Sequence, residues 1–259
     1  MPRSFSLSLA AVDMLSQALR VNCRLFPFEI PSFGQLEEDR NRIAKVVFTD
    51  LSNRGLIHHS EVDPDVAAAL TVTSDHDIGI GMMGTVNHDR RIRARAAAAG
   101  STAVLAIQEG QSIQFDLISP AALARSLVAL LPPAQAGPGQ SVQVIEAAPQ
   151  PRDDSGGGFV QPVRAPRTNT DAQLRMAAAM LERPRTGYGF FTVSGRGRHG
   201  REVDAGTVSW IDTDAGRYLS LSRPEPNGAI RATYSPADNA RLAQQLGDLI
   251  LSAAPTTRP

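Results

Sequence analysis

The stretch with the clearest chemical pattern is "DIGIGMMG", in which three glycines have G-x-G-x-x-G spacing: Gly79, Gly81 and Gly84. This spacing binds the pyrophosphate of a dinucleotide only when it follows a buried strand and opens a helix, because the helix start supplies free backbone N–H groups. The preceding residues, "TVTSDHD", are too polar for a buried parallel strand. Glu109 does lie at roughly the spacing of a ribose-binding acid, about twenty residues or slightly more beyond the glycines. A dinucleotide-binding enzyme therefore stays as an alternative.

The histidines lack the spacing of a metal site. The five are His58, His59, His76, His88 and His199, and none is placed with a second histidine or a carboxylate in a recognised zinc pattern. "SDHDIG" groups Asp75, His76 and Asp77 as in a metal-dependent hydrolase, but the further ligand clusters of such a site are not visible. No G-x-S-x-G nucleophile motif occurs. We therefore expect surface histidines, no metal ion, no cofactor and no catalytic residue.

Composition gives no general attraction to nucleic acid or to a membrane. Lysine plus arginine equals aspartate plus glutamate at 26 each. The single cysteine, Cys23, excludes an internal disulfide and is expected to be packed among apolar residues. Asp13 interrupts the opening segment, and no eighteen apolar residues run together. We expect a cytosolic protein with no membrane insertion.

Two basic segments, "DRRIRAR" and "GRGRHGR", have the residue type that binds phosphate. "DLSNRGLI", after a helical pattern, resembles the end of a winged-helix unit. Against this interpretation, charge runs are typical of solvated loops, and the neutral total gives no electrostatic footprint. We expect no nucleic-acid partner, and a winged-helix-like nucleic-acid-binding protein is the main alternative function.

The first half predicts helices followed by strands. One amphipathic helix starts after a capping residue, Ser8, a second stops at Gly55, and Asp63-Pro64 opens a third. "TAVLAI", "QEGQ" and "SIQFDLI" then predict an antiparallel hairpin, and Ser119-Pro120 opens a further helix. Residues 134–170 are rich in glycine and proline and contain one predicted strand, "SVQVI".

The order of elements restarts at Asp171 with a helix, the strand "GYGFFTV", a basic loop, a hairpin and a helix from Ser235. "SPAALAR" and "SPADNAR", 116 residues apart, share five residues. The matching order predicts an internal duplication with a pseudo-twofold axis. It also makes the glycines of "DIGIGMMG" part of a strand, at a bulge or a close backbone approach. We expect one domain over 1–259, with halves 7–133 and 171–251, a linker 134–170 and a disordered tail 252–259.

Specific segments resemble a known family. They are "TGYGFFTV", "VSWIDTDAGRYLSLS" and "YSPADNARLAQQLGDLI" in the second half, and "LSNRGLI", "DPDVAAAL", "AVLAI" and "LVALLPPAQAGPGQSV" in the first. On these residues the chain resembles the EspG family, the ESX secretion-associated proteins of actinobacterial type VII secretion. The resemblance spans about Leu7 to Ile250, and "DTDAGRY" and "ALLPPAQAGPGQSV" are its most specific parts. The glycine-rich strand at 79–84 and the polar segment 149–170 depart from the family pattern.

The resemblance implies an α/β fold in which a central antiparallel sheet carries two helical bundles related by a quasi-twofold axis. Such proteins are not enzymes. They are cytosolic chaperones that bind the exposed tip of the PPE protein in a PE–PPE heterodimer. They keep this cargo soluble until the membrane-embedded secretion machine takes it, so the resemblance implies the same partner here.

The second half offers a candidate partner surface because its strands are much the more aromatic. A period of two places Tyr188 and Phe190 on one face of their strand, and Phe191 and Val193 on the other. One face is expected to pack on helices, and the other needs a cover. The predicted apolar centre is Tyr188, Phe190 and Trp210, and the predicted polar rim is Arg196, Arg198, Asp212 and Asp214. Core packing is the competing interpretation of these aromatics.

Overall fold

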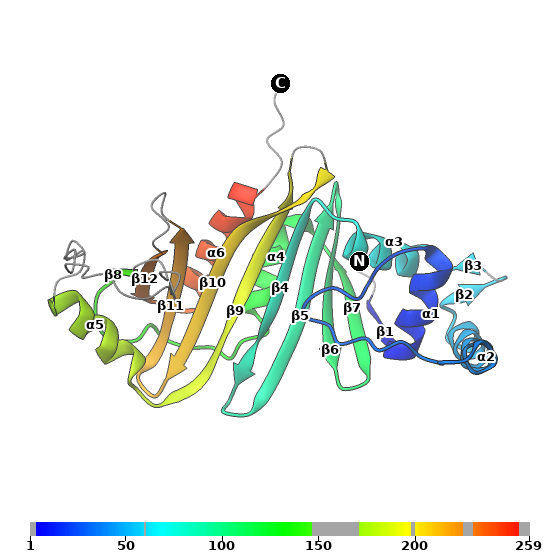
Figure 1. Ribbon diagram of the computed structural model, residues 1–259, viewed down its shortest axis with the longest axis horizontal. Helices are drawn as coiled ribbons and strands as arrows, with labels where there is room; N and C mark the ends of the chain where they lie inside the picture. The colour runs from blue at the N-terminus through cyan, green and yellow to red at the C-terminus, as the bar shows by residue number, and fades with distance from the viewer. Residues whose placement is uncertain (1–3, 60, 147–170, 198–199, 225–229, 254–259) are drawn as a thin grey trace, which may run out of the picture.

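The computed structural model describes residues 4–59, 61–146, 171–197, 200–224 and 230–253. Its main feature is a ten-stranded antiparallel sheet in the order β1-β7-β6-β5-β4-β9-β10-β11-β12-β8 (Figure 1). The strands of the first half are β1 (Ser4–Ser8), β4 (Ile78–Val86), β5 (Arg90–Ala99), β6 (Thr102–Glu109) and β7 (Ser112–Ile118). Those of the second are β8 (Val142–Glu146), β9 (Arg185–Arg196), β10 (Glu202–Thr213), β11 (Gly216–Pro224) and β12 (Ile230–Pro236).

The order of the strands confirms the quasi-twofold repeat and the predicted fold class. β4 and β9 pair at the centre, and each leads outward through three further strands in sequence order. β1 closes one edge and β8 closes the other. Helix α3 (Pro64–Ser74) precedes β4 as α5 (Asp171–Leu181) precedes β9, and α4 (Leu123–Val128) follows β7 as α6 (Asn239–Ala253) follows β12. The two halves thus share one succession of elements.

Local capping residues start the first-half helices where the sequence predicts. Ser8 Oγ accepts from Ala11 N, 3.1 Å away, at the start of α1 (Leu9–Leu19). Asp63 caps α3 through Asp65 N, with proline at the first helical position. Between them lie α2 (Glu37–Asn53) and a small hairpin of β2 (Ile57–His58) and β3 (Glu61–Val62). The "DLSNRGLI" segment forms the end of α2 and the turn that leads into this hairpin at Ile57.

The helices after the two Ser-Pro pairs begin later than the sequence predicts. A 3-10 turn, η1 (Pro120–Ala122), precedes the short α4. Ser235 belongs to β12, where its Oγ bonds Ser141 Oγ at 2.8 Å, and Asp238 Oδ1 accepts from Arg241 N at the start of α6. The prediction of a helix from Ser235 was therefore wrong by four residues. Helix α6 runs to Ala253, and the rest of the predicted tail lies outside the described residues.

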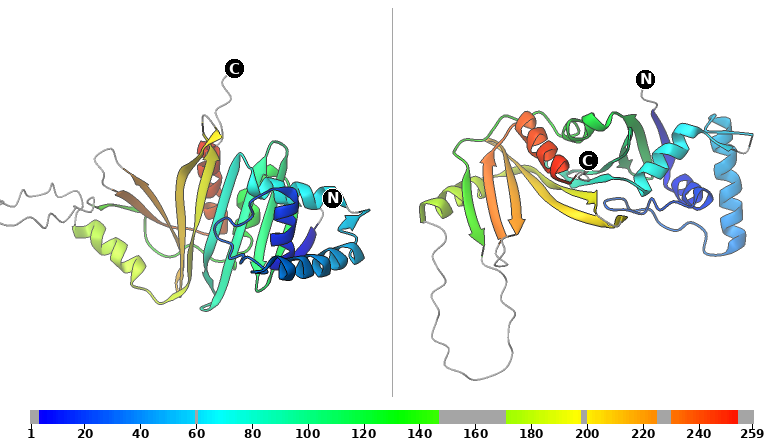
Figure 2. Two further views of the ribbon diagram at one scale, coloured as in Figure 1. Left: turned by 45° about the vertical axis from the view of Figure 1, so that its right-hand side comes forward. Right: turned by 90° about the horizontal axis from the view of Figure 1, so that it is seen from above.

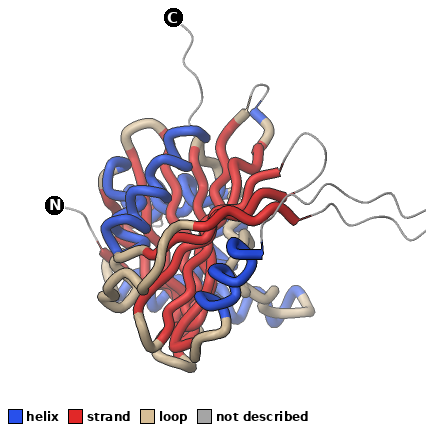
Figure 3. The backbone as a smooth tube through the Cα atoms, turned by 90° about the vertical axis from the view of Figure 1, so that its left-hand side faces the viewer, coloured by secondary structure: helices blue, strands red, loops and turns tan. Residues whose placement is uncertain are grey.

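The two faces of the sheet are covered differently. On one, here called the helical face, Ile80, Met82, Phe191, Val208 and Trp210 are buried against α4 and α6. Figures 2 and 3 show this pair of helices on one side of the sheet and other helices on the opposite side. Successive residues of a strand point to opposite faces, so Met83, Phe190 and their neighbours lie on the second face, here called the open face.

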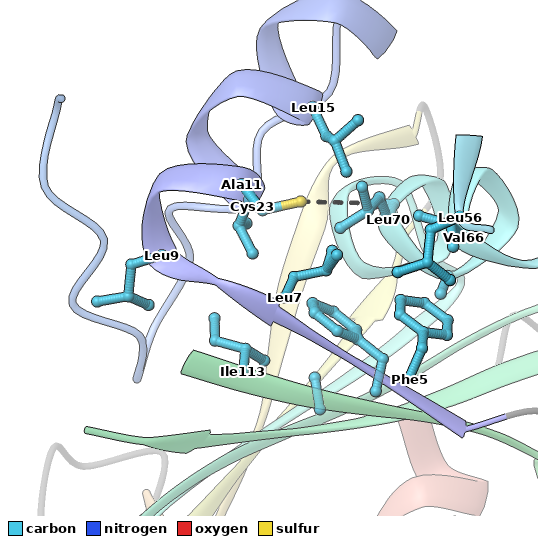
Figure 4. Close-up of a cluster of buried hydrophobic side chains, with 14 of the residues drawn as sticks. Phe5, Leu7, Leu9, Ala11, Leu15, Cys23, Leu56, Val66, Leu70 and Ile113 are labelled. Atoms are coloured by element: carbon cyan, nitrogen blue, oxygen red, sulfur yellow. Dashed lines mark hydrogen bonds between the residues drawn. The ribbon is translucent and has the colours of Figure 1, made fainter. Parts of the chain in front are cut away.

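Helices cover the open face only at its two ends. Over the first half, α1 and α3 bury a core with β1, β6 and β7, in which Leu7, Leu15, Leu70 and Ile113 meet (Figure 4). Cys23 belongs to this core, as predicted, with its thiol 3.7 Å from the Leu70 carbonyl oxygen. Over the second half, α5 packs on β8 and β11. Among the described helices, α3 still covers the Ala97 end of β5, but none covers the open face of the Arg91–Arg93 end of β5 or of β4, β9 and β10 beside it.

The glycines of β4 allow neighbouring side chains and strands to approach its backbone closely. A Cβ on Gly79 would lie 2.4 Å from the His76 ring, and one on Gly81 would lie 2.7 Å from the Phe26 ring. A Cβ on Gly84 would lie 2.5 Å from the Tyr188 carbonyl oxygen. β4 turns directly into β5 rather than into a helix. The spacing is thus that of a central strand packed on both faces, and the dinucleotide interpretation is not supported.

Candidate functional site

The uncovered middle of the open face holds a pocket of about 490 Å³. Its floor is apolar, with Met83 from β4, Tyr188 and Phe190 from β9 and Ile211 from β10. The other lining residues include Arg91 and Arg93 of β5 and Arg185 at the start of β9, with Thr85 and Ser209. We call this the sheet groove. It is an apolar surface with a basic border, which suits a protein segment better than a small polar metabolite.

Register positions these side chains in rows across four strands. Arg91, Thr85, Tyr188 and Ile211 are successive cross-strand partners and form the first row. Arg93, Met83, Phe190 and Ser209 form the second in the same way. Directly paired residues share a face, so each row crosses the groove with an arginine at its β5 end. Tyr188 is 55% exposed, and Phe190 is half-buried.

The connection between α1 and α2, residues 20–36, crosses the open face beside the groove (Figures 1 and 2). Its Phe26 ring stacks on Phe190 with the centroids 5.9 Å apart and the planes 13° from parallel. Phe26 lies over Gly81, where a side chain would block it. Its carbonyl oxygen accepts from Arg95 Nη1 at 2.9 Å. The connection therefore closes one end of the groove and leaves the Tyr188 end open.

A polar cluster lies beyond that closed end. His76 Nε2 lies 3.1 Å from Arg95 Nη2 and 3.7 Å from Glu202 Oε1. The His76 side chain is buried, so the prediction that all histidines lie on the surface was wrong for this residue. Burial, and then the Arg95 guanidinium, lower the pKa of His76. Glu202 accepts from Ser194 Oγ at 2.5 Å, and this bond lowers the pKa of its carboxyl group.

Trp210 borders the groove, but its side chain does not belong to the predicted apolar centre. It pairs with Gly189, so its side chain lies on the helical face, fully buried, with its ring centroid 5.0 Å from that of Phe191. Gly84 and Gly189 leave the room that the indole fills. Our placement of Trp210 beside Tyr188 was wrong because one residue of register exchanges the faces of a strand.

The predicted polar rim is also corrected. Asp212 lies buried in an ion pair with the fully buried Arg217. Arg196 lies at the opposite end of β9 from Tyr188, bound to Asp75 and to Asp77. Asp214 is exposed in the β10–β11 turn at the Tyr188 end of the hairpin, with Arg183 Nη1 3.9 Å away, but it is not among the residues that line the groove. Arg198 lies outside the described residues.

The sequence did hold a signal for the border that we missed. Along β5, "RIRAR" alternates arginine with apolar residues, which places Arg91, Arg93 and Arg95 on one face. We assigned these arginines to a solvated loop, whereas the structure places them along the strand that borders the groove. Phe26 and Met83 had no local signal, because they reach the site through long-range pairing.

The described part of the chain offers neither a metal-binding cluster nor a membrane-spanning helix. There, no three side chains of histidine, cysteine, aspartate or glutamate are grouped to hold a metal ion. Within the same residues, no helix combines the length and the apolar character needed to cross a membrane.

Comparison with known proteins identifies the family. A search of curated proteins found no match. Among solved structures, the chain is similar to a Mycobacterium tuberculosis protein described as the type VII secretion system chaperone EspG5, in complex with a PE25–PPE41 dimer. The TM-score is 0.67 at 15% sequence identity, and the match covers 99% of both chains, so it shows a shared fold. The family model described as the EspG family matches residues 8–248. The chain therefore belongs to the EspG family.

Proposed function

We propose that this protein is a cytosolic chaperone of a type VII secretion system that binds a PE–PPE heterodimer and keeps it soluble until export. The observation that carries the proposal is the match of the EspG family over residues 8–248. The fold shared with EspG5, which was solved with a PE25–PPE41 dimer, supports the same class of cargo. Such a role needs no chemical step and no cofactor.

We propose the sheet groove as the cargo site. Tyr188 and Phe190 present aromatic surface in the middle of the open face. In the described sheet, the helices that cover the two ends of this face do not reach them. A helical cargo with an apolar tip would self-associate, and a preformed sheet face masks such a tip by burying it. Aromatic residues within a polar border are the composition of a protein-binding surface.

The nucleic-acid alternative draws less support from the structure. The arginines of "DRRIRAR" lie along an apolar groove rather than across a broad basic surface. Arg196, from the second basic segment, is held by Asp75 and Asp77. The chain also has no excess positive charge to give the strong salt-dependent binding of such proteins.

Co-expression with PE–PPE heterodimers of the same organism tests the proposal. We expect one or more heterodimers to co-purify with this chain at equal stoichiometry through size-exclusion chromatography. The same heterodimer expressed alone should aggregate. If no heterodimer from that organism forms a complex, and all stay soluble alone, the proposal is wrong. Duplex DNA serves as the second ligand, and tight, salt-dependent binding to it would favour the alternative.

A further inference from the structure

The groove contains an internal pattern that indicates what a partner presents to it. Arg91, Arg93 and Arg95 stand at consecutive open-face positions of β5, so each begins one cross-strand row. The third row continues from Arg95 through Gly81 and Thr192. A basic group thus recurs at the two-residue spacing of the strand, beside Thr85, Met83 and Gly81 of β4 in turn.

The α1–α2 connection already occupies two of the three rows. In the third row, the Phe26 ring fills the space over Gly81 while its carbonyl oxygen accepts from Arg95. In the second, Glu29 Oε1 lies 2.6 Å from Arg93 Nη2 while Phe26 stacks on Phe190. Arg93 and Arg95 therefore each donate to an oxygen of the α1–α2 connection, and the same connection places the Phe26 ring over the groove floor.

The first row has no such occupant. Arg91 is exposed, and its side chain has no ion pair or hydrogen bond within the described residues. Among the residues that the structure describes, the side chain of Arg185, at the same end of the pocket, donates only to the Leu181 carbonyl oxygen at 3.3 Å. No carboxylate is among the residues that line the pocket. Tyr188, the floor residue of this row, is the more exposed of the two groove aromatics.

We infer that the cargo places one or more carboxylates on Arg91 and Arg185, beside an apolar side chain that packs on Tyr188. This inference rests on the proposed function and names the chemistry of the cargo segment. Its acidic group would extend the pattern that Glu29 and Phe26 begin in the neighbouring rows. Strands lie about 4.8 Å apart, so the arginine and the tyrosine backbones are separated by roughly 10 Å across β4. The cargo segment is therefore acidic and apolar within about two helical turns or one tight turn.

Charge reversal tests this with a matched control on the same strand. Arg91→Glu with Arg185→Glu should weaken binding of the purified, co-purifying PE–PPE heterodimer by about tenfold or more at low salt. The loss should shrink at about 0.5 M salt, because screening removes the repulsion. Arg90→Glu is the control, since Arg90 is adjacent to Arg91 but points to the opposite face. It should change affinity by no more than about twofold.

The outcomes separate this inference from the function on which it rests. If the wild-type chain binds the heterodimer and the Arg91/Arg185 variant binds it with the same affinity as the Arg90 control, the chaperone function stands and the inference is wrong. Tighter binding by the reversed variant would also overturn it. Recovery of affinity when acidic residues of the cargo tip are changed to lysine would support it directly. Failure of the wild-type chain to bind any heterodimer would overturn the proposed function. Arg91→Gln with Arg185→Gln, which adds no new charge, should give a smaller loss in the same direction.

Discussion

Asp212→Ala should be among the most destabilising single changes in the second half. Arg217 is fully buried, and its Nε and Nη2 lie 2.5 Å and 3.0 Å from the two Asp212 oxygens. Its remaining partners are neutral: the Asn239 side-chain oxygen at 2.8 Å and the Pro132 carbonyl oxygen at 3.1 Å. Without the carboxylate, a guanidinium charge stays buried without a counter-charge. We therefore expect a loss of about 3–5 kcal/mol in the free energy of unfolding.

That loss is a large share of the roughly 5–15 kcal/mol that stabilises a typical domain. The assay is urea unfolding followed by the fluorescence of Trp210, the single tryptophan of the chain, with circular dichroism as a second probe. Asp212→Ala with Arg217→Met removes both charges, so the double variant should be more stable than Asp212→Ala alone.

A loss below about 1 kcal/mol for Asp212→Ala would refute this reasoning, because it would mean that Arg217 finds water or another acceptor once its partner is gone. The reasoning would also be refuted if the double variant lost more free energy of unfolding than the two single variants lose together. In that case the two side chains would stabilise the turn through their packing and not through their mutual charge.

Three further predictions concern the centre of the sheet. Gly84→Ala should lower the free energy of unfolding by about 1–3 kcal/mol, because its Cβ would meet the carbonyl oxygen of the adjacent strand. Gly81→Ala should lower it less, because the exposed Phe26 ring can move away, and the midpoints of urea unfolding compare the two variants. Trp210→Ala should cost about 3–5 kcal/mol and Tyr188→Ala about 0.5 kcal/mol or less, by circular dichroism, since only the first is core. Burial lowers the pKa of His76 below that of the unfolded chain, so stability should fall as the pH drops below about 6.5; His76→Gln should flatten this slope, and equal slopes would contradict it.

The sequence was sufficient for most features that depend on neighbouring residues, although the helices after both Ser-Pro pairs begin later than predicted. The caps at Ser8 and Asp63, the hairpin that follows "TAVLAI" and the repeated succession of elements were all predicted, because each depends on a few adjacent side chains. The repeat then predicted the pseudo-twofold axis, and the resemblance to the EspG family implied the central antiparallel sheet. The central β4–β9 pair is where they do so.

The candidate site was only half predictable because it depends on register. Tyr188 and Phe190 share a face within one strand, and a period of two is enough to show it. Trp210 and Asp212 lie on a second strand, and their face depends on how β10 pairs with β9. Phe26 reaches the groove from a connection more than fifty residues away from β4, so nothing local could place it. The missed border is different, because the alternation in "RIRAR" was visible in the sequence.

The most direct measurement is the affinity of Phe190→Asp for the co-purifying PE–PPE heterodimer, by calorimetry, beside that of Val46→Asp. Val46 is 66% exposed on α2, outside the groove, so its variant carries the same new charge on another apolar surface position. We predict that Phe190→Asp stays folded by circular dichroism and loses about 2 kcal/mol or more of binding free energy, roughly thirtyfold in Kd, while Val46→Asp binds like the wild type. Folded Phe190→Asp that binds with unchanged affinity would contradict the sheet groove as the cargo site, and an unfolded variant would show that Phe190 belongs to the core.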